Sequence, residues 1–136
     1  MDAAQTSFQD AAHVLSQARK SSAQALDQAM TAELAPLKME RAVFTTQVRD
    51  ADPSTTGMDQ VDFVVATNPG APSGPLAKIA SGGELSRFLL ALKVCLSRDG
   101  AQNTMIFDEI DRGVGGATAD AVGRRLSRLA QDAQAR

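Results

Sequence analysis

The sequence has neither tryptophan nor tyrosine, and Cys95 is the single cysteine among its 136 residues. One cysteine excludes a disulfide within the chain and is typical of a reducing compartment. With only five phenylalanines as large aromatic residues, the core must be filled mainly by aliphatic side chains. The length is sufficient for one domain with a modest core.

The sequence has no large excess of charge of either sign. It contains 14 lysines and arginines and 16 aspartates and glutamates, which give a net charge of −2. Without a basic excess, composition does not support nucleic-acid binding by this segment alone. No apolar run approaches the roughly 20 residues of a membrane-spanning helix, and the N-terminus does not resemble a secretory signal. These absences predict a soluble cytoplasmic protein without a membrane partner.

Residues 3–35 contain no glycine or proline, which predicts one long helix ended by Pro36. Small and apolar side chains recur in this helix at alternating spacings of four and three, at Phe8, Ala11, Leu15, Ala18, Ser22, Ala25, Ala29 and Ala32. The repeat fits a surface helix packed on the domain, and it also fits the end of a coiled-coil arm. We assign residues 1–37 to the helix and arm, and residues 38–136 to a globular lobe.

The middle of the chain reads as strands and turns. Alternating apolar residues predict a hairpin from 42–49 and 61–66, joined by a polar turn at 50–57. Residues 68–75 contain three prolines and two glycines, which predicts a loop.

The last third reads as a helix, a strand and a helix. Cys95 is expected as a small buried side chain beside the apolar face of the first helix, which comprises Leu85, Phe88, Leu89, Leu92 and Leu96. Residues 104–107 are apolar and predict a buried central strand. A final helix from about residue 118 is expected to face inward with Ala119, Val122, Leu126 and Leu129.

Two short motifs carry the chemistry. Ser81-Gly82-Gly83-Glu84 opens a helix, and free N–H groups at a helix N-terminus attract a phosphate. The alternative is an ordinary serine cap completed by Glu84. Asp108 and Glu109 end the apolar run, where one carboxylate can hold Mg²⁺ while the other orients a water; the alternative is a solvated strand end. The glycine-rich loop with a lysine that grips a nucleotide is missing from the sequence.

These motifs resemble those of the ATP-binding-cassette ATPases. The segment 79–84 is similar to their signature motif, 105–109 to their Walker B strand, and Asp111 to the start of their D-loop. Within that superfamily, 85–87 and 107–116 resemble the RecN branch of SMC-like bacterial DNA repair proteins, as do the segments 66–70 and 75–78.

The resemblance implies an α/β fold, namely part of the C-terminal lobe of an ABC/SMC-type P-loop ATPase head, with ATP and Mg²⁺ as cofactors. Asp108 would help hold Mg²⁺, Glu109 would be the catalytic base, and Asp111 would couple two sites. Ser81, Gly82, Gly83 and Glu84 would contact ATP held by the second head of a homodimer. The phosphate (Walker A) loop would come from an N-terminal lobe, DNA would be bound by the full-length protein in break repair, and the protein would associate with the nucleoid.

Two features depart from the family pattern. The Walker A loop is missing, and His13, the only histidine, does not match the family's switch histidine. We therefore expect a lobe truncated at both ends and inactive alone. The alternatives are a transporter nucleotide-binding domain, against which Ile110 argues because transporters usually have proline there, and a non-catalytic interaction module.

One basic cluster stands apart from these motifs. Arg124, Arg125 and Arg128 lie within one predicted helix. A solvated helix face is the favoured interpretation, and a phosphate-backbone contact is the alternative.

Overall fold

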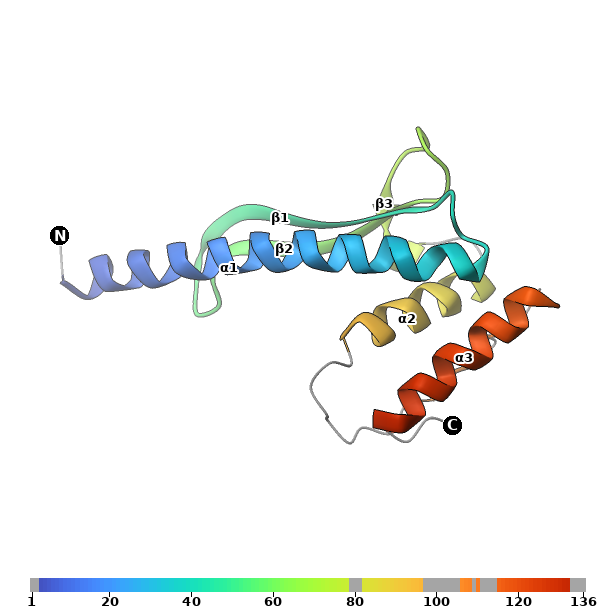
Figure 1. Ribbon diagram of the computed structural model, residues 1–136. Helices are drawn as coiled ribbons and strands as arrows, with labels where there is room; N and C mark the ends of the chain where they lie inside the picture. The colour runs from blue at the N-terminus through green and yellow to red at the C-terminus, as the bar shows by residue number, and fades with distance from the viewer. Residues whose placement is uncertain (1–2, 79–81, 97–105, 109, 111–114, 133–136) are drawn as a thin grey trace.

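The structure, a computed structural model, describes residues 3–78, 82–96, 106–108, 110 and 115–132 (Figure 1). A long helix lies along a β-hairpin, and two further helices pack beneath its C-terminal half. The elements in chain order are α1 (Ala3–Leu34), the 3₁₀ turn η1 (Ala35–Leu37), β1 (Val43–Ser54), β2 (Gly57–Ala66), β3 (Gly74–Pro75), the 3₁₀ turn η2 (Leu76–Lys78), α2 (Gly82–Leu96) and α3 (Ala117–Asp132).

Helix α1 confirms the long helix predicted for the N-terminal residues. It runs for 32 residues and gives way to η1 at the turn that contains Pro36. Lys38 then adopts a left-handed conformation with φ of 56°, and its amide donates to the Ala35 carbonyl. This tight stop turns the chain back toward β1. Among the described residues, no helix is long and apolar enough to cross a membrane.

The small-residue repeat of α1 is not the side that packs against the lobe, so the interpretation that this repeat packs on the domain is wrong, and the coiled-coil arm stays a prediction. The buried residues of α1 are Ala12, Ala23, Met30 and Leu34. The first three each lie one position after a member of the predicted repeat, whose own members are mostly exposed, as at Ala11 and Ala18. Polar groups on the packed side bind the hairpin, so the tertiary partner, and not the small-residue repeat, selects the buried side.

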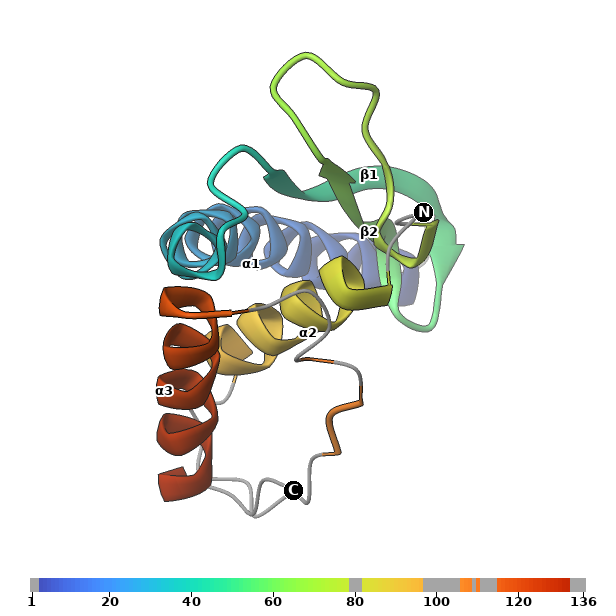
Figure 2. The same cartoon turned by 90° about the vertical axis from the view of Figure 1, so that its right-hand side faces the viewer.

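Strands β1 and β2 confirm the predicted hairpin and extend it. The expected turn at 50–57 is wrong for residues 50–54, which continue β1. Pro53 is tolerated there because β1 is an edge strand of the described sheet and its register shifts between Asp50 and Ser54. The predicted loop at 68–75 also needs correction at its end, where Gly74 and Pro75 pair with β2 to give the sheet order β1-β2-β3. The rest of that loop projects away from the helices (Figure 2).

A buried carboxylate fastens the hairpin to α1. Ser16 donates its hydroxyl to both oxygens of Asp59 at 2.7 and 2.8 Å, and Arg19 Nη1 donates to Asp59 Oδ2 at 3.0 Å. The other guanidinium nitrogen donates to the Thr56 carbonyl at 2.8 Å. The Asp59 side chain is only 1% exposed, so these bonds replace its water.

A second carboxylate on α1 binds the edge of the sheet. Asp27 Oδ1 accepts the backbone N–H of Thr46, in β1, at 2.8 Å. The long helix therefore takes the place of a neighbouring strand at this point.

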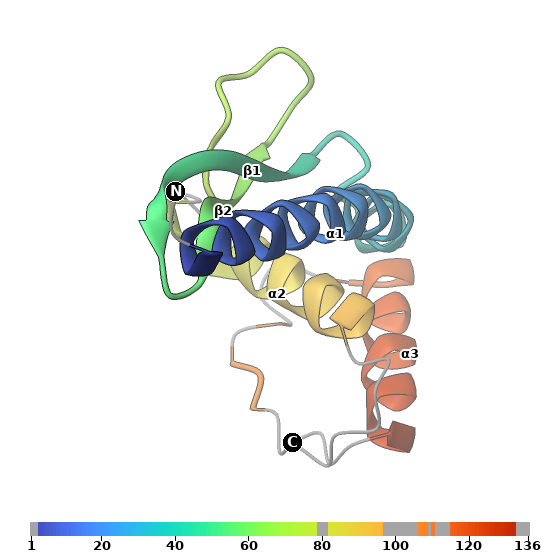
Figure 3. The ribbon, with the colours of Figure 1, turned by 90° about the vertical axis from the view of Figure 1, so that its left-hand side faces the viewer.

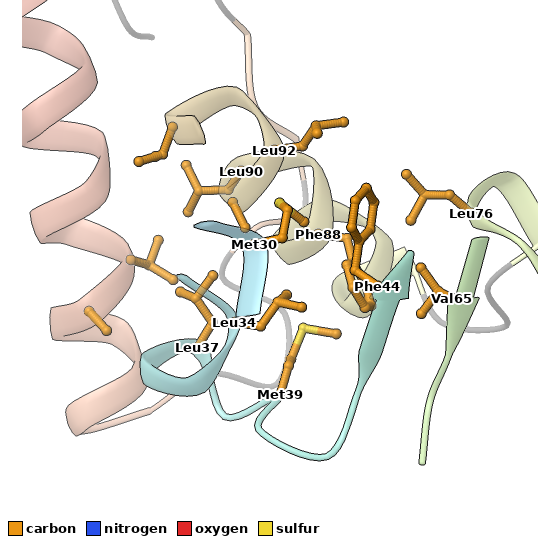
Figure 4. Packing of buried hydrophobic residues seen from close by; sticks show 14 of the residues in the cluster. Met30, Leu34, Leu37, Met39, Phe44, Val65, Leu76, Phe88, Leu90 and Leu92 are labelled. Atoms are coloured by element: carbon orange, nitrogen blue, oxygen red, sulfur yellow. The ribbon is translucent and has the colours of Figure 1, made fainter. Parts of the chain in front are cut away.

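One apolar core joins the sheet to all three helices (Figure 4). Phe88 of α2 and Met30 of α1 are fully buried at its centre, and the Phe88 ring lies near Phe44 of β1. Its other buried members are Leu34, Leu37, Met39, Val65, Leu76, Leu90, Ala91, Leu92, Val94, Ala121, Val122 and Leu129. Cys95 is half-buried against this core, in line with the prediction of a packed small side chain.

The faces predicted for α2 and α3 are only partly right. Phe88 and Leu92 are buried, but Leu89 and Leu96 are 39% and 59% exposed. Because α2 lies between α1 and α3, its buried surface includes Leu90 and is wider than one stripe (Figure 3). On α3, Val122 and Leu129 are buried as expected, whereas Ala119 is exposed and Thr118 and Ala121 are buried in its place.

The predicted central strand is not observed where the structure describes it. Residues 106–108 have no regular secondary structure, and Ile106 is 79% exposed; Thr104 and Met105 lie outside the described residues. An apolar strand is stable in a sheet only when neighbours pair with its backbone, and the described strands form a separate antiparallel sheet.

We predict that Asp59→Asn weakens the fold and flattens its acid dependence. Hydrogen bonds from Ser16 and Arg19 lower the pKa of the Asp59 carboxyl. Since the folded pKa is below the unfolded one, this stabilisation is complete above about pH 4 and is lost as the pH falls toward the folded pKa. Chemical unfolding at pH 7 and between about pH 4 and 2 measures both effects. Asp52→Asn, which removes an exposed carboxylate of the same hairpin, should change neither the stability at pH 7 nor its acid dependence. Equal behaviour of the two variants would contradict the role of Asp59 in fastening the hairpin to α1.

We also predict that Gly57→Ala destabilises the chain more than Gly70→Ala. Both glycines have positive φ, +102° and +83°, so alanine is strained at either position. Only at Gly57 would the new Cβ meet neighbours, Leu15 Cδ2 at 3.1 Å and Arg19 Nη1 at 3.2 Å, whereas nothing lies within 4 Å at Gly70. We expect the free energy of unfolding to fall by about 1 kcal/mol more for Gly57→Ala. Equal losses would show that the hairpin end is not packed on α1.

Candidate functional site

The N-terminus of α2 is formed by the predicted phosphate-contacting motif. The helix begins at Gly82, and Gly83 is buried, whereas Ser81 lies outside the described residues. Glu84 is half-buried in the first turn, where its negative charge is favourable to the helix dipole. The first N–H groups of a helix have no partner within the helix and are available to an anion.

The acidic segment lies beside this helix. Ser86 donates its hydroxyl to the backbone carbonyl of Asp108 at 3.0 Å, and Lys93 Nζ lies 5.2 Å from the centre of the Phe107 ring. The Asp108 side chain is exposed, while Glu109 and Asp111 lie outside the described residues. The helix that the first motif opens is thus in contact with the segment that carries the second.

A pocket of about 420 Å³ borders the same end of α2. Glu84 is one of its walls; the chain between η1 and β1 contributes Lys38 and Arg41, and the loop after β2 contributes Asn68. The pocket could not be predicted from the sequence, because its residues come from three separate segments that only the fold brings together.

The described residues fit a metal ion that arrives with a nucleotide. Among them, no group of three or more His, Cys, Asp and Glu side chains is arranged to hold a metal. Asp108 offers an exposed carboxylate, and Mg²⁺ in nucleotide sites keeps several waters and needs only one or two protein carboxylates in addition to phosphate oxygens.

The arginine cluster of α3 is largely engaged in ion pairs. Arg125 Nε binds Glu33 Oε2 of α1 at 2.9 Å, and both side chains are 18% exposed. Arg128 Nη1 lies 4.0 Å from the other Glu33 oxygen, and Arg124 binds Asp120 one turn away. The expected solvated face is therefore wrong for Arg125, which joins α3 to α1.

We predict unequal effects when these arginines are truncated. Arg125→Ala leaves the half-buried Glu33 without its closest partner and should lower the free energy of unfolding by about 2 kcal/mol. Arg128→Ala removes a long, exposed contact and should cost less than about 0.5 kcal/mol. Denaturant titration of both variants measures the difference, and a larger loss for Arg128→Ala would contradict the structure.

Comparison with known proteins shows similarity to one group of relatives. No protein-family model matches the chain. The DNA repair protein RecN of Rickettsia prowazekii (strain Madrid E) is 44% identical over 131 residues, which cover 96% of this chain and 24% of the relative. RecN of Synechocystis sp. (strain ATCC 27184 / PCC 6803 / Kazusa) is 46% identical over 85% of the chain and 20% of its own length, and RecN of Vibrio cholerae serotype O1 is 40% identical over 98% and 24%. The chain spans about a fifth to a quarter of the length of these relatives, and it is similar to them over most of its own length.

Proposed function

We propose that this chain is the signature-bearing part of a RecN-type ATPase head, within the C-terminal lobe. The observation that supports it best is the contact between the first turns of α2 and the segment of Asp108, which joins a phosphate-contacting helix end to an acidic one. The relatives carry the name DNA repair protein RecN. We extend that role to this chain as part of a larger protein that acts on broken DNA.

In this proposal each motif serves a different nucleotide. Asp108 holds the Mg²⁺ of an ATP bound to its own head, Glu109 accepts a proton from the attacking water, and Asp111 couples the two sites. Ser81, Gly82, Gly83 and Glu84 donate backbone and hydroxyl hydrogen bonds to the γ-phosphate of an ATP bound to the other head. The Mg²⁺ ion, when bound, neutralises charge on the phosphate oxygens.

The proposal requires two partners. One is a lobe that carries a Walker A loop, and the other is a second head. Three large apolar side chains on or beside α2 support an apolar partner surface, because Leu89, Leu96 and Ile106 are 39%, 59% and 79% exposed. The small-residue side of α1, which is exposed at Ala11, Ala18 and Ser22, supports a further partner along a coiled-coil arm.

We predict that the chain alone hydrolyses ATP negligibly and that an N-terminal RecN lobe with a Walker A loop restores turnover. Phosphate release is measured for each part and for the mixture. Glu109→Gln in the mixture should lower kcat by at least about 100-fold, as for loss of a general base. Asp52→Asn, which changes an exposed carboxylate of the hairpin outside both motifs, serves as the control and should leave kcat unchanged.

Two results would overturn the proposal. Hydrolysis by the chain alone would show that the nucleotide is gripped by residues other than a Walker A loop. A mixture that forms a stable complex but binds no ATP would favour the non-catalytic interaction module.

A further inference from the structure

We propose that Ser86 is a positioning residue that holds the backbone of the acidic segment against α2. The hydrogen bond is independent of the proposed ATPase function, but the effect of Ser86 on ATP turnover rests on that proposal. Ser86 lies outside the four-residue signature motif and has no role in the function described above.

The hydrogen bond of Ser86 is unusual for a serine within a helix. Helical serines commonly donate to the carbonyl four residues earlier, which here would be that of Gly82. Ser86 instead donates across 22 positions of sequence to the Asp108 carbonyl, at 3.0 Å. A hydroxyl has one proton to donate, so this bond uses its whole donor capacity.

The carbonyl that accepts this bond belongs to the peptide group between Asp108 and Glu109. A peptide group is planar, so holding its oxygen restricts the rotation that aims both carboxylates. We therefore infer that Ser86 acts on Asp108 and Glu109 through their shared peptide group.

The contact with Ser86 acts on a segment whose described residues lie outside the sheet. Residues 106–108 form no part of the described sheet, and Ile106 is 79% exposed. Among the described residues, Phe107 and Ile110 pack against the core, and Lys93 approaches the Phe107 ring. Lys93 lies seven residues after Ser86, two turns along the same side of α2. One side of one helix thus carries the Ser86 hydrogen bond and the Lys93 contact with the segment.

A consequence follows for a head that serves two nucleotides. In the proposed head, the first turn of α2 contacts the ATP bound to the other head. The same helix would also orient Asp108 and Glu109 toward the ATP bound to its own head. Displacement of α2 at one site would then shift the Mg²⁺ ligand of the other through a single hydroxyl.

The first experiment uses the chain alone and needs no nucleotide. Hydrogen exchange of the amides of residues 106–110 is compared in the unchanged chain, Ser86→Ala, Ser86→Thr and Ser127→Ala. Ser127 is an exposed serine of α3, so its alanine variant controls for the higher helix propensity of alanine. We expect exchange to accelerate about fivefold in Ser86→Ala, in proportion to one net hydrogen bond, and to stay near the original rate in the other two.

The second experiment uses the mixture with the Walker A lobe and measures ATP turnover against Mg²⁺ concentration. Ser86→Ala should raise the Mg²⁺ concentration for half-maximal turnover by about fivefold, and Ser86→Thr should restore it. A serine that only stabilised the fold would lower the active fraction without moving this midpoint.

The outcomes separate the two proposals. Unchanged exchange in Ser86→Ala, or failure of Ser86→Thr to restore it, overturns the positioning role whatever the activity. An unshifted Mg²⁺ midpoint in an active mixture overturns it as well. If the unchanged mixture hydrolyses no ATP, the ATPase proposal fails, and the exchange result alone decides whether Ser86 holds the segment.

Discussion

The burial of the C-terminal end of α1 and of the 3₁₀ turn η1 that follows it is the constraint on which the rest of the lobe depends. Met30, Leu34 and Leu37 are between 0 and 1% exposed, and they contact a core built from the sheet, α2 and α3. Removing buried side chains of this size from a core typically costs about 2–5 kcal/mol each. The helix end is therefore not an appendage to the lobe. It is the surface on which the other elements are assembled, and the Glu33–Arg125 pair fixes α3 on its flank.

The long helix, the hairpin and α2 could be predicted from the sequence, because the residue patterns within each element agree with the residues at its ends. Pro36 ends α1, alternation marks the hairpin, and Gly82-Gly83 opens α2, as predicted. The buried faces followed less well. Period alone does not distinguish Ala11 from Ala12, and only the polar anchors of the hairpin make the second of them the packed residue. Leu89 was expected inside and is exposed, because α2 packs through a wider surface than its leucine stripe.

The candidate site shows the same division. Residue type and spacing identified Gly82, Gly83, Glu84 and Asp108 as candidates, and their roles stay proposals; Ser81, Glu109 and Asp111 lie outside the described residues. The hydrogen bond between Ser86 of α2 and the Asp108 carbonyl was not predictable, because the sequence around Ser86 does not distinguish it from any other helical serine. The partner of Arg125 lies 92 positions away, which no pattern within α3 could reveal. Chemistry is carried by short motifs, whereas their mutual placement depends on long-range contacts.

The carboxylate of Asp27 has a further consequence for how this sheet can grow. By accepting the Thr46 amide, it occupies a hydrogen-bonding position on the outer side of β1 that another strand would need. Each of the two edges of a sheet can pair with a further strand. At Thr46, the helix occupies the β1 edge. At this position the Thr46 amide cannot pair with a further strand, whereas the other edge of the described sheet is formed by β3.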